Sequence, residues 1–306
     1  MLSNGHIKFK KDLPGPARID LEYDFDSSKL SRIDCGGKVF CLAVPEDPEA
    51  LMFLLENCMK YRIGFHILGG CTNTLLSDRF HNEVFIKLGK GFQNLEAMEN
   101  GEIKVGAAHD MQRLIVRCAR LGMDSSFMAG IPGTLGGAVK CNSGPKGSPI
   151  GSYVVKIGLI KATGDKIIAK EIDREGLRFS YRKLELPDDE IINYVFLRFP
   201  KGEDNILASL RERIKDKKIK QPLNTKNLGC FFKNPKKDLS AGKLIEQAGL
   251  KGLRYGGAAV SSLHANYIEN VSNASFSDIT GLASIIKANI LKNNNIKLEL
   301  EVRIIE

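Results

Sequence analysis

Residues 129–138 constrain the fold of this chain more than any other segment, because four glycines and Pro132 fall within them. The glycines are Gly130, Gly133, Gly136 and Gly137. Glycine weakens helix and strand interiors, and proline lacks a backbone donor, so this composition predicts a loop. Backbone without Cβ atoms approaches a ligand closely, which favours a nest for an anion or a flat cofactor. An ordinary tight loop is the alternative.

A second glycine cluster lies upstream. Residues 65–68 are expected to form a strand that ends at Gly69-Gly70-Cys71-Thr72-Asn73. This sequence is neither the G-x-G-x-x-G fingerprint of dinucleotide-binding folds nor a P-loop, since no lysine follows. Two such clusters favour one extended ligand held at two places, such as a dinucleotide pyrophosphate, over two unrelated turns.

Hydrophobic periodicity and capping residues predict the remaining elements. Strands are expected at 39–44, 65–68, 84–88, 102–107, 153–161, 166–169, 191–199, 258–261, 266–268 and 296–305, with a turn at 163–165. Helices are expected at 47–62, 110–121, 201–218, 240–248 and 277–292. The character of the chain changes near Lys201, where we place a domain boundary.

Length and composition indicate a soluble globular enzyme. The chain has 306 residues, of which 43% are hydrophobic and 26% are charged. This length is enough for two domains whose cores need no disulfide or metal ion for stability. Eighteen consecutive apolar residues occur nowhere, and residues 1–11 lack an apolar core, so we expect neither a membrane span nor a secretory signal. Seven scattered cysteines without a C-x-x-C pair fit a reducing cytoplasm and predict no metal site.

The net charge of +9 fits either a preference for anionic ligands or a solvated basic surface. Residues 211–220 hold six cations interspersed with Glu212 and Asp216. A solvated helix face explains this run better than a nucleic-acid patch, because no aromatic side chains interleave it.

Individual residues suggest chemistry without deciding it. Arg182, next to Tyr181, is either a surface charge or a planar donor fork for a carboxylate or enolate. Cys230 is either a small buried hydrophobe or a reactive thiol beside Lys233. His264 is interpreted as structural.

The last strand places four apolar side chains on one face and three charged ones on the other. The charged residues are Glu299, Glu301 and Arg303. Alternation alone makes Glu301 a solvated residue and does not separate it from Glu299.

Eight segments between Arg32 and Arg303 together carry a family resemblance. They are LGGCTNTLLSD, AGIPGTLGGAVKCNSG, FSYR, QP, GCFFKNP, AGKLIEQAGLKG, VSSLHANYIEN and LELEVR. In content and order the chain resembles the UDP-N-acetylenolpyruvoylglucosamine reductase family. The short segment between Arg182 and the strand at 191–199 resembles the shorter family type, which lacks a substrate-covering tyrosine loop.

The resemblance implies an α+β fold. Residues 1–200 would form an FAD-binding region of the vanillyl-alcohol-oxidase type, with two subdomains split near residue 90. Residues 201–306 would form an α+β substrate-binding domain, and the last strand, at about 296–306, can return to the first region.

The resemblance also implies residue roles. Arg182 and Glu301 would stabilise an enolate, Glu301 in its protonated form, and Cys230 would protonate the neighbouring carbon where the family usually has serine. FAD would contact the two glycine segments, namely Gly69, Gly70, Cys71, Thr72, Asn73, Gly130, Ile131, Pro132, Gly133, Thr134, Gly136, Gly137 and Ala138. Substrate would contact Tyr181, Gly229, Lys233 and Asn234. Cys71-Thr72 and Ser126 depart from the family pattern, which has Gly-Ser and glutamate there.

Together these observations predict a cytoplasmic FAD enzyme, a monomer or weak oligomer, that uses NADPH to reduce the enolpyruvyl ether of a UDP-sugar in peptidoglycan synthesis. Neither nucleic acid nor a membrane is an expected partner. The alternatives are another flavin oxidase or dehydrogenase of the same fold and, from charge alone, a basic nucleic-acid-binding protein.

Overall fold

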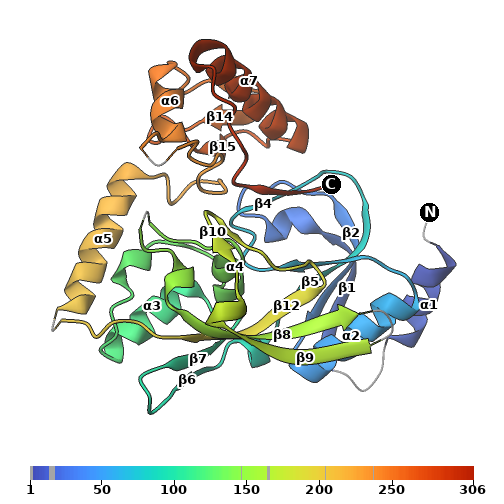
Figure 1. Ribbon diagram of the computed structural model, residues 1–306. Coiled ribbons are helices and arrows are strands. Elements are labelled where there is room, and N and C mark those ends of the chain that lie inside the picture. Colours follow the sequence, from blue (N-terminus) through green and yellow to red (C-terminus); the bar gives the residue numbers. More distant parts are fainter. Residues whose placement is uncertain (1–2, 14–17, 146, 164–165, 204, 237) are drawn as a thin grey trace. The chain divides into compact units, whose positions relative to one another are not determined.

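The structure is a computed structural model that describes residues 3–13, 18–145, 147–163, 166–203, 205–236 and 238–306 (Figure 1). It divides into two compact units. Unit 1 comprises Met1–Phe25, Val39–Gly70 and Asn82–Ile214, and unit 2 comprises Asp26–Lys38, Cys71–His81 and Lys215–Glu306. Compact units need not coincide with ligand-binding domains, so the domain bounds expected near residues 90 and 201 stay predictions.

The first sheet of unit 1 has the strand order β1-β2-β5-β3, and β3 runs parallel to β5. Its elements are α1 (Asn4–Asp12), β1 (Ile19–Asp26), β2 (Lys38–Pro45), α2 (Pro48–Lys60), β3 (Phe65–Leu68) and β5 (His81–Lys87). Helix α2 begins as the sequence predicts, because the Asp47 side chain accepts a hydrogen bond from Ala50 N at 2.9 Å. Leu51, Leu54 and Leu55 of α2 are fully buried in the core beneath this sheet.

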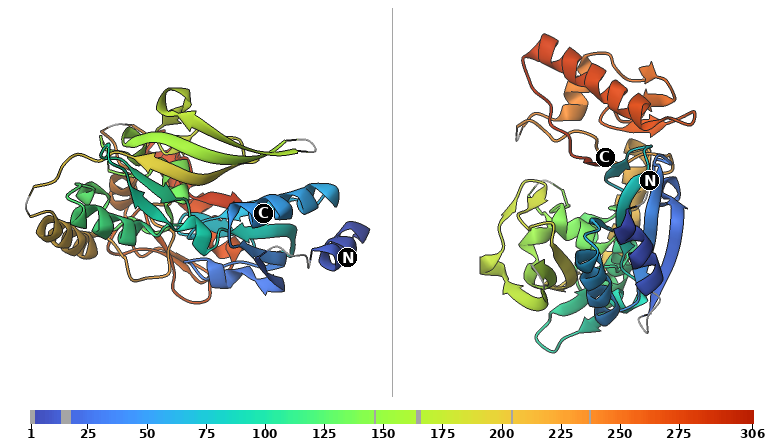
Figure 2. Two further views of the ribbon diagram at one scale, coloured as in Figure 1. Left: turned by 90° about the horizontal axis from the view of Figure 1, so that it is seen from below. Right: turned by 90° about the vertical axis from the view of Figure 1, so that its right-hand side faces the viewer.

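The second sheet of unit 1 is antiparallel, with the order β6-β7-β12-β8-β9. Its strands are β6 (Leu95–Ala97), β7 (Ile103–Gly106), β8 (Val154–Thr163), β9 (Lys166–Asp173) and β12 (Glu190–Leu197). Figure 2 shows β8 and β9 as one long hairpin, whose expected turn includes residues 164–165, outside the described part. Helices α3 (Met111–Arg120) and α4 (Leu135–Lys140) supply buried side chains to the core of this sheet.

Short elements connect these larger ones. Strands β10 (Phe179–Ser180) and β11 (Lys183–Leu184) form a small hairpin. Single 3-10 turns occupy Ser27–Leu30, Lys90–Phe92, Ser126–Met128, Ile150–Ser152 and Arg174–Gly176. The division between the two units falls within helix α5 (Ile206–Lys220). Residues 211–220 of this helix are largely exposed, as expected of a solvated basic helix.

Unit 2 packs two helices with short strands (Figure 1). Its elements are β4 (Thr74–Leu76), α6 (Ala241–Gln247), β13 (Arg254–Tyr255), β14 (Ala258–Val260), β15 (Ile268–Asn270), α7 (Phe276–Asn294) and β16 (Arg303–Ile305). Ser275 and Asp278 cap the start of α7 reciprocally, and Asn295 ends it in the left-handed conformation. Strand β16 pairs in parallel with β4, so Arg303 lies opposite Thr74.

Two expectations from the sequence are wrong. Gly136 and Gly137 lie inside a helix, α4, rather than in a loop. The Thr134 side chain caps this helix, and a Cβ on Gly136 would approach the Ala107 Cβ to 3.0 Å, so tight packing compensates for the low helix propensity of glycine. The last strand is also shorter than the expected 296–305: only Arg303–Ile305 pair as a strand, and the preceding residues form isolated backbone bonds.

Within the described residues, no helix has both the length and the apolar character required to cross a membrane.

Candidate active site

The two glycine clusters predicted from the sequence meet within unit 1. Gly69 directly follows β3, and a Cβ on it would lie 2.6 Å from the Thr134 Oγ1 and 3.9 Å from the Gly137 Cα. A side chain at residue 69 would therefore separate the two segments. The structure thus forms one glycine-lined cradle from two stretches of chain that lie far apart in sequence.

Backbone hydrogen bonds fix the second glycine segment. Met111 N donates to Gly133 O at 3.0 Å, and Gly136 N donates to Ala107 O at 2.8 Å. Gly130 and Gly133 have φ angles of 74° and 98°, a region that glycine enters without the penalty other residues pay. The segment is thus held rigid in a shape that only its glycines permit.

The second half of the first glycine loop belongs to unit 2. Cys71 is 4% exposed and has a φ of 46°, and its carbonyl accepts a hydrogen bond from Arg32 N at 3.4 Å. Asn73 Nδ2 donates to the Glu301 carbonyl at 3.1 Å, and Arg303 N donates to the Asn73 carbonyl at 3.0 Å. Asn73 therefore fastens the predicted flavin loop to the residues on both sides of Val302.

Arg182 lies in the turn of the β10–β11 hairpin in unit 1. Tyr181 and Arg182 are the two turn residues, and Arg182 has a φ of 59°, which costs a side-chain-bearing residue about 1–2 kcal/mol. Its Nη1 donates to Gly144 O at 2.7 Å, and its guanidinium lies 5.4 Å from the centre of the exposed Tyr181 ring. A strained arginine held by a hydrogen bond is typical of a functional site.

Asn142 anchors the hairpin that carries Arg182. This buried side chain donates from Nδ2 to Ser180 O at 2.8 Å and accepts at Oδ1 from Gly151 N at 3.0 Å. The nitrogen and the oxygen of this side-chain amide are thus both used to join β10 to the segment after α4.

Cys230 begins an extended segment of unit 2 that is bonded on two sides. Phe231 N donates to Asn266 O at 2.7 Å, while the Phe231 carbonyl accepts from Glu301 N at 2.9 Å. Phe232 forms an antiparallel bridge with Leu300. These bonds place Cys230 and Glu301 on neighbouring segments although 70 positions of sequence separate them.

The structure distinguishes Glu301 from Glu299, which alternation could not do. The Glu299 side chain is 72% exposed, and one of its oxygens lies 3.4 Å from Lys233 Nζ. Glu301, in contrast, is half-buried, and its amide donates a hydrogen bond to the Phe231 carbonyl. Glu299 is thus a surface carboxylate, and Glu301 lies near the interior.

Tyr267 is a residue of this site that the sequence reasoning missed. It is 6% exposed and directly follows Asn266, whose carbonyl accepts a hydrogen bond from the amide of Phe231, the residue after Cys230. Burial raises the pKa of Tyr267. Nothing in the spacing of VSSLHANYIEN marks this tyrosine.

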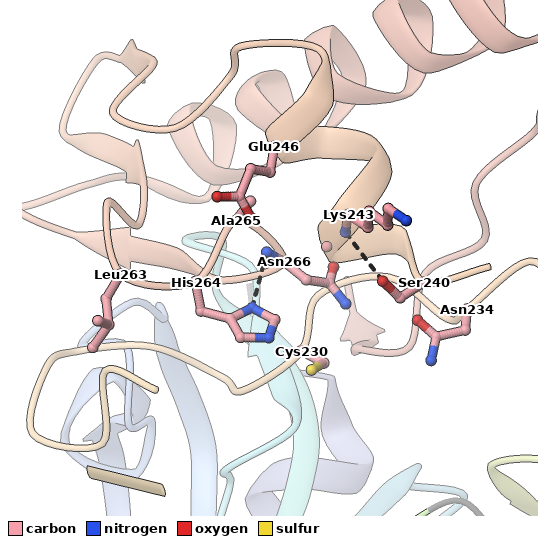
Figure 3. Close-up of a pocket in the computed structure, with 10 residues that line it drawn as sticks. Cys230, Asn234, Ser240, Lys243, Glu246, Leu263, His264, Ala265 and Asn266 are labelled. Carbon is pink, nitrogen blue, oxygen red and sulfur yellow. Dashed lines mark hydrogen bonds between the residues drawn. The ribbon is translucent and has the colours of Figure 1, made fainter. Parts of the chain in front are cut away.

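A pocket of about 320 Å³ opens beside Cys230 within unit 2 (Figure 3). Its lining residues are Cys230, Asn234, Ser240, Gly242, Lys243, Glu246, Leu263, His264, Ala265 and Asn266. His264 accepts a hydrogen bond at Nδ1 from Asn266 N at 3.2 Å, and burial lowers its pKa, so the ring is neutral at pH 7. The pocket therefore presents a thiol, an imidazole, an ammonium group and amides to a polar ligand.

The remaining predicted substrate residues border this segment. Gly229 has a φ of 78° and donates from its amide to Asn227 Oδ1 at 2.9 Å. Asn234 accepts at Oδ1 from Ala241 N at 3.0 Å, which ties the pocket wall to the start of α6. A left-handed glycine just before Cys230 lets the chain turn into the pocket.

Comparisons with known proteins now identify the family. Residues 221–305 match the model of the UDP-N-acetylenolpyruvoylglucosamine reductase C-terminal domain, and residues 40–169 match an FAD-binding domain. The reductase of Anaeromyxobacter sp. (strain Fw109-5) is 33% identical over 98% of this chain and 93% of its own length. That of Myxococcus xanthus is 35% identical over 90% and 88%. The chain belongs to the UDP-N-acetylenolpyruvoylglucosamine reductase family.

A solved member of the reductase family confirms the fold. The Thermus caldophilus enzyme superposes with a TM-score of 0.78 at 28% identity, covering 95% of this chain and 100% of that one. The family resemblance and the α+β FAD-binding fold expected from the sequence are thus confirmed.

The residues of this reductase-family chain fit FAD. The cradle formed by Gly69, Thr134 and Gly137 leaves no space for a Cβ at residue 69, while exposed Gly137 presents bare backbone at the start of α4. An extended anionic cofactor needs such close approach to backbone amides. The assignment of individual residues to FAD, substrate or catalysis stays a prediction.

Proposed function

We propose that this protein reduces UDP-N-acetylglucosamine enolpyruvate to UDP-N-acetylmuramate with NADPH as the electron donor. The product is a peptidoglycan precursor, so the activity serves cell-wall formation, cell shape and division. We place the enzyme in the cytoplasm as a monomer or weak oligomer. The family relationship over 98% of the chain supports the reaction, and the neighbouring Cys230 and Glu301 support the chemistry.

FAD held by the two glycine segments would supply the hydride, drawn from NADPH, for the terminal carbon of the enolpyruvyl group. The electron pair of the double bond then moves onto the substrate carboxylate as an enolate. We assign Arg182 and Glu301 to stabilise this charge: the guanidinium is charged at any working pH, and protonated Glu301 donates a hydrogen bond. Donors fixed before the charge develops are the strongest single contribution to such catalysis.

Cys230 completes the reaction as the general acid. Its S–H bond breaks as a C–H bond forms at the carbon next to the carboxylate, and the electron pair of the S–H bond stays on sulfur. Water then returns a proton to the thiolate. Overall, one hydride from NADPH and one proton from solvent are added across the double bond. The observation that carries this role is the position of Cys230 in the lining of the pocket, beside the Phe231 carbonyl to which Glu301 N donates a hydrogen bond.

We assign substrate binding to four residues, namely Tyr181, Gly229, Lys233 and Asn234. Lys233 is suited to an anionic group because Glu299, with which it forms an ion pair, is largely exposed and easily exchanged. The two glycine segments are assigned to FAD, as the cradle at Gly69 supports.

The test follows NADPH oxidation by the purified, flavin-loaded protein with and without the enolpyruvyl UDP-sugar. We expect the sugar to accelerate NADPH consumption and the product to be the lactyl ether, two hydrogens heavier by mass spectrometry. A yellow protein that oxidises NADPH equally well without the sugar would instead be a different flavin oxidase of the same fold. A protein that binds no flavin would contradict the proposal altogether.

A further inference from the structure

The backbone on each side of Cys230 is held by a buried asparagine to which the mechanism above gives no role. On the N-terminal side, the Oδ1 of Asn227 accepts a hydrogen bond from Gly229 N at 2.9 Å. On the C-terminal side, Asn266 is bonded to the two residues that follow Cys230. The two asparagines are 2% and 3% exposed, so their amide groups are committed to these bonds.

Asn266 takes the place of a neighbouring β-strand beside Phe231 and Phe232. Its backbone carbonyl accepts from Phe231 N at 2.7 Å, and its Oδ1 accepts from Phe232 N at 3.0 Å. Its Nδ2 donates to the Phe232 carbonyl at 2.9 Å. The side-chain amide therefore satisfies both backbone groups of Phe232, as an adjacent strand would. Water has little access to replace these bonds, because both phenylalanines are 1% exposed.

These bonds connect the wall of the pocket to Cys230 and Glu301. Asn266 is fixed in the wall because its own amide donates to His264 Nδ1 at 3.2 Å, and Cys230, His264 and Asn266 line the same pocket (Figure 3). On the opposite edge of the segment, Glu301 N donates to the Phe231 carbonyl at 2.9 Å. The register of residues 231–232 against Asn266 thus decides where the thiol lies in the wall.

We propose that Asn266 is a positioning residue for Cys230 and, through Phe231, for Glu301. It acts by holding the backbone of Phe232 with its side-chain amide, which fixes the thiol within reach of the substrate carbon. A general acid works only at hydrogen-bond distance from the atom it protonates, and a displacement of about 1 Å can cost about 100-fold in rate. The inference rests on the proposed role of Cys230 and extends it.

The first test measures the hold of Asn266 on the segment by amide hydrogen exchange in the full-length, flavin-loaded protein without substrate. In Asn266→Ala both side-chain bonds to Phe232 are lost, so exchange in the peptide containing residues 231–232 should accelerate about tenfold or more. The matched control is Asn270→Ala. Asn270 is 8% exposed, and its side chain donates to Ile33 O at 2.8 Å and accepts from Ala274 N at 2.7 Å. Its loss should leave exchange at residues 231–232 unchanged.

The second test separates positioning from general support of the fold. Reoxidation of the pre-reduced flavin by the enolpyruvyl UDP-sugar should slow about 10–100-fold in Asn266→Ala. Its solvent deuterium isotope effect should increase, because proton transfer from a misplaced thiol becomes the slower step. Asn270→Ala should change neither quantity. Asn266→Asp has the same shape and keeps the acceptor for Phe232 N but loses the donor, so it should show the same changes to a smaller degree even if the alanine variant does not fold.

Three results would overturn the proposal: unchanged exchange at residues 231–232, an unchanged isotope effect in the Asn266 variants, or equal slowing by Asn270→Ala. Hydrogen exchange does not require turnover. Faster exchange in a protein that fails to reduce the UDP-sugar would therefore uphold the hold of Asn266 on the Cys230 segment and refute the proposed function alone.

Discussion

At Cys230 a thiol occupies the position where the family resemblance implies a serine hydroxyl. A model thiol has a pKa of about 8.5, so it is mostly protonated at pH 7 and still releases its proton far more readily than a hydroxyl. The same acidity makes this thiol sensitive to oxidation and alkylation.

Substitution of Cys230 tests its role as the acid. Cys230→Ser should retain substantial turnover, because a hydroxyl can still deliver a proton, whereas Cys230→Ala should lose about 10²–10⁴-fold in kcat. The measurement is reoxidation of the pre-reduced flavin by the enolpyruvyl UDP-sugar, with flavin absorbance as the control for loading. Equal rates in the two variants would remove Cys230 from the mechanism.

Single residues also limit what the sequence can predict about the site. Arg182, Cys230 and Glu301 could be named only through the family resemblance, because spacing left each of them with an ordinary structural alternative. Asn73 was not given its structural role, since it acts through a partner distant in sequence. Contacts of this kind leave no local pattern.

Among the elements, those with local signals were predictable. Helices α2 and α3 begin after Asp47 and Asp110, whose side chains accept the expected capping bonds. Helix α4 was missed because glycine content argues for a loop, and only its packing against Ala107 compensates. Residues 296–302 alternate like a strand, but Glu299 accepts an isolated backbone bond from Lys233 and Glu301 donates one to Phe231, which no periodicity reveals.

The cradle formed by Gly69, Thr134 and Gly137 gives a prediction at the scale of the elements. Gly69→Ala places a Cβ 2.6 Å from Thr134 Oγ1, so the two segments must separate and flavin binding should weaken at least tenfold. Flavin released on dilution, measured by its fluorescence, reports the change.

The matched control for Gly69→Ala is Gly101→Ala. Gly101 has a φ of 79° and open space around its Cα, so alanine there introduces backbone strain but no collision. It should cost about 1–2 kcal/mol of stability without changing flavin affinity. Equal flavin loss in both variants would show that general destabilisation, rather than the cradle, governs binding.

The start of β12 provides a pH-dependent ion pair. Glu190, whose side chain is 6% exposed, accepts from Lys170 Nζ at 2.6 Å and from Lys161 Nζ at 3.0 Å. Burial alone would raise the pKa of Glu190, but the two ammonium groups together lower it. The folded state therefore holds this proton less tightly than the unfolded chain. The stabilisation is complete above the ordinary pKa of 4.5 and is lost as pH falls through the lowered value.

Glu190→Gln should consequently lower the free energy of unfolding by about 1–3 kcal/mol at pH 7, with the difference from the original protein shrinking below about pH 4. Urea denaturation at several pH values measures it. Glu171→Gln, at a more exposed pair with Lys156, should cost less than about 1 kcal/mol. A Glu190 effect that is constant down to pH 3.5 would contradict this account.

At the scale of the molecule, the core of unit 2 is assembled from distant parts of the chain. Ile33, Cys35 and Leu75 contribute buried side chains to the same cluster as α6 and α7, and β16 needs β4 as its partner. The sequence indicated a change of character near Lys201 but could not show that two N-terminal segments complete the C-terminal core. Such complementarity depends on three-dimensional packing alone.

A fragment of residues 215–306 should accordingly fail to fold by itself, because it lacks these buried side chains and the partner of β16. We expect no cooperative thermal transition by circular dichroism, with the full-length protein as the reference. Co-expression with residues 1–214 should restore a folded complex. A cooperative transition from the isolated fragment would disprove this dependence.

Asn73 has a consequence that concerns ligands rather than folding. Its side chain and backbone join the glycine loop at residues 69–73 to Glu301 and Arg303. If occupancy at one end restrains Asn73, the free energy of that restraint is shared with the other end, and thermodynamic reciprocity requires each ligand to change the affinity of the other by the same factor. If the two sites are those proposed above and either ligand immobilises Asn73, the second ligand need not do so again, and bound substrate would then slow the loss of flavin.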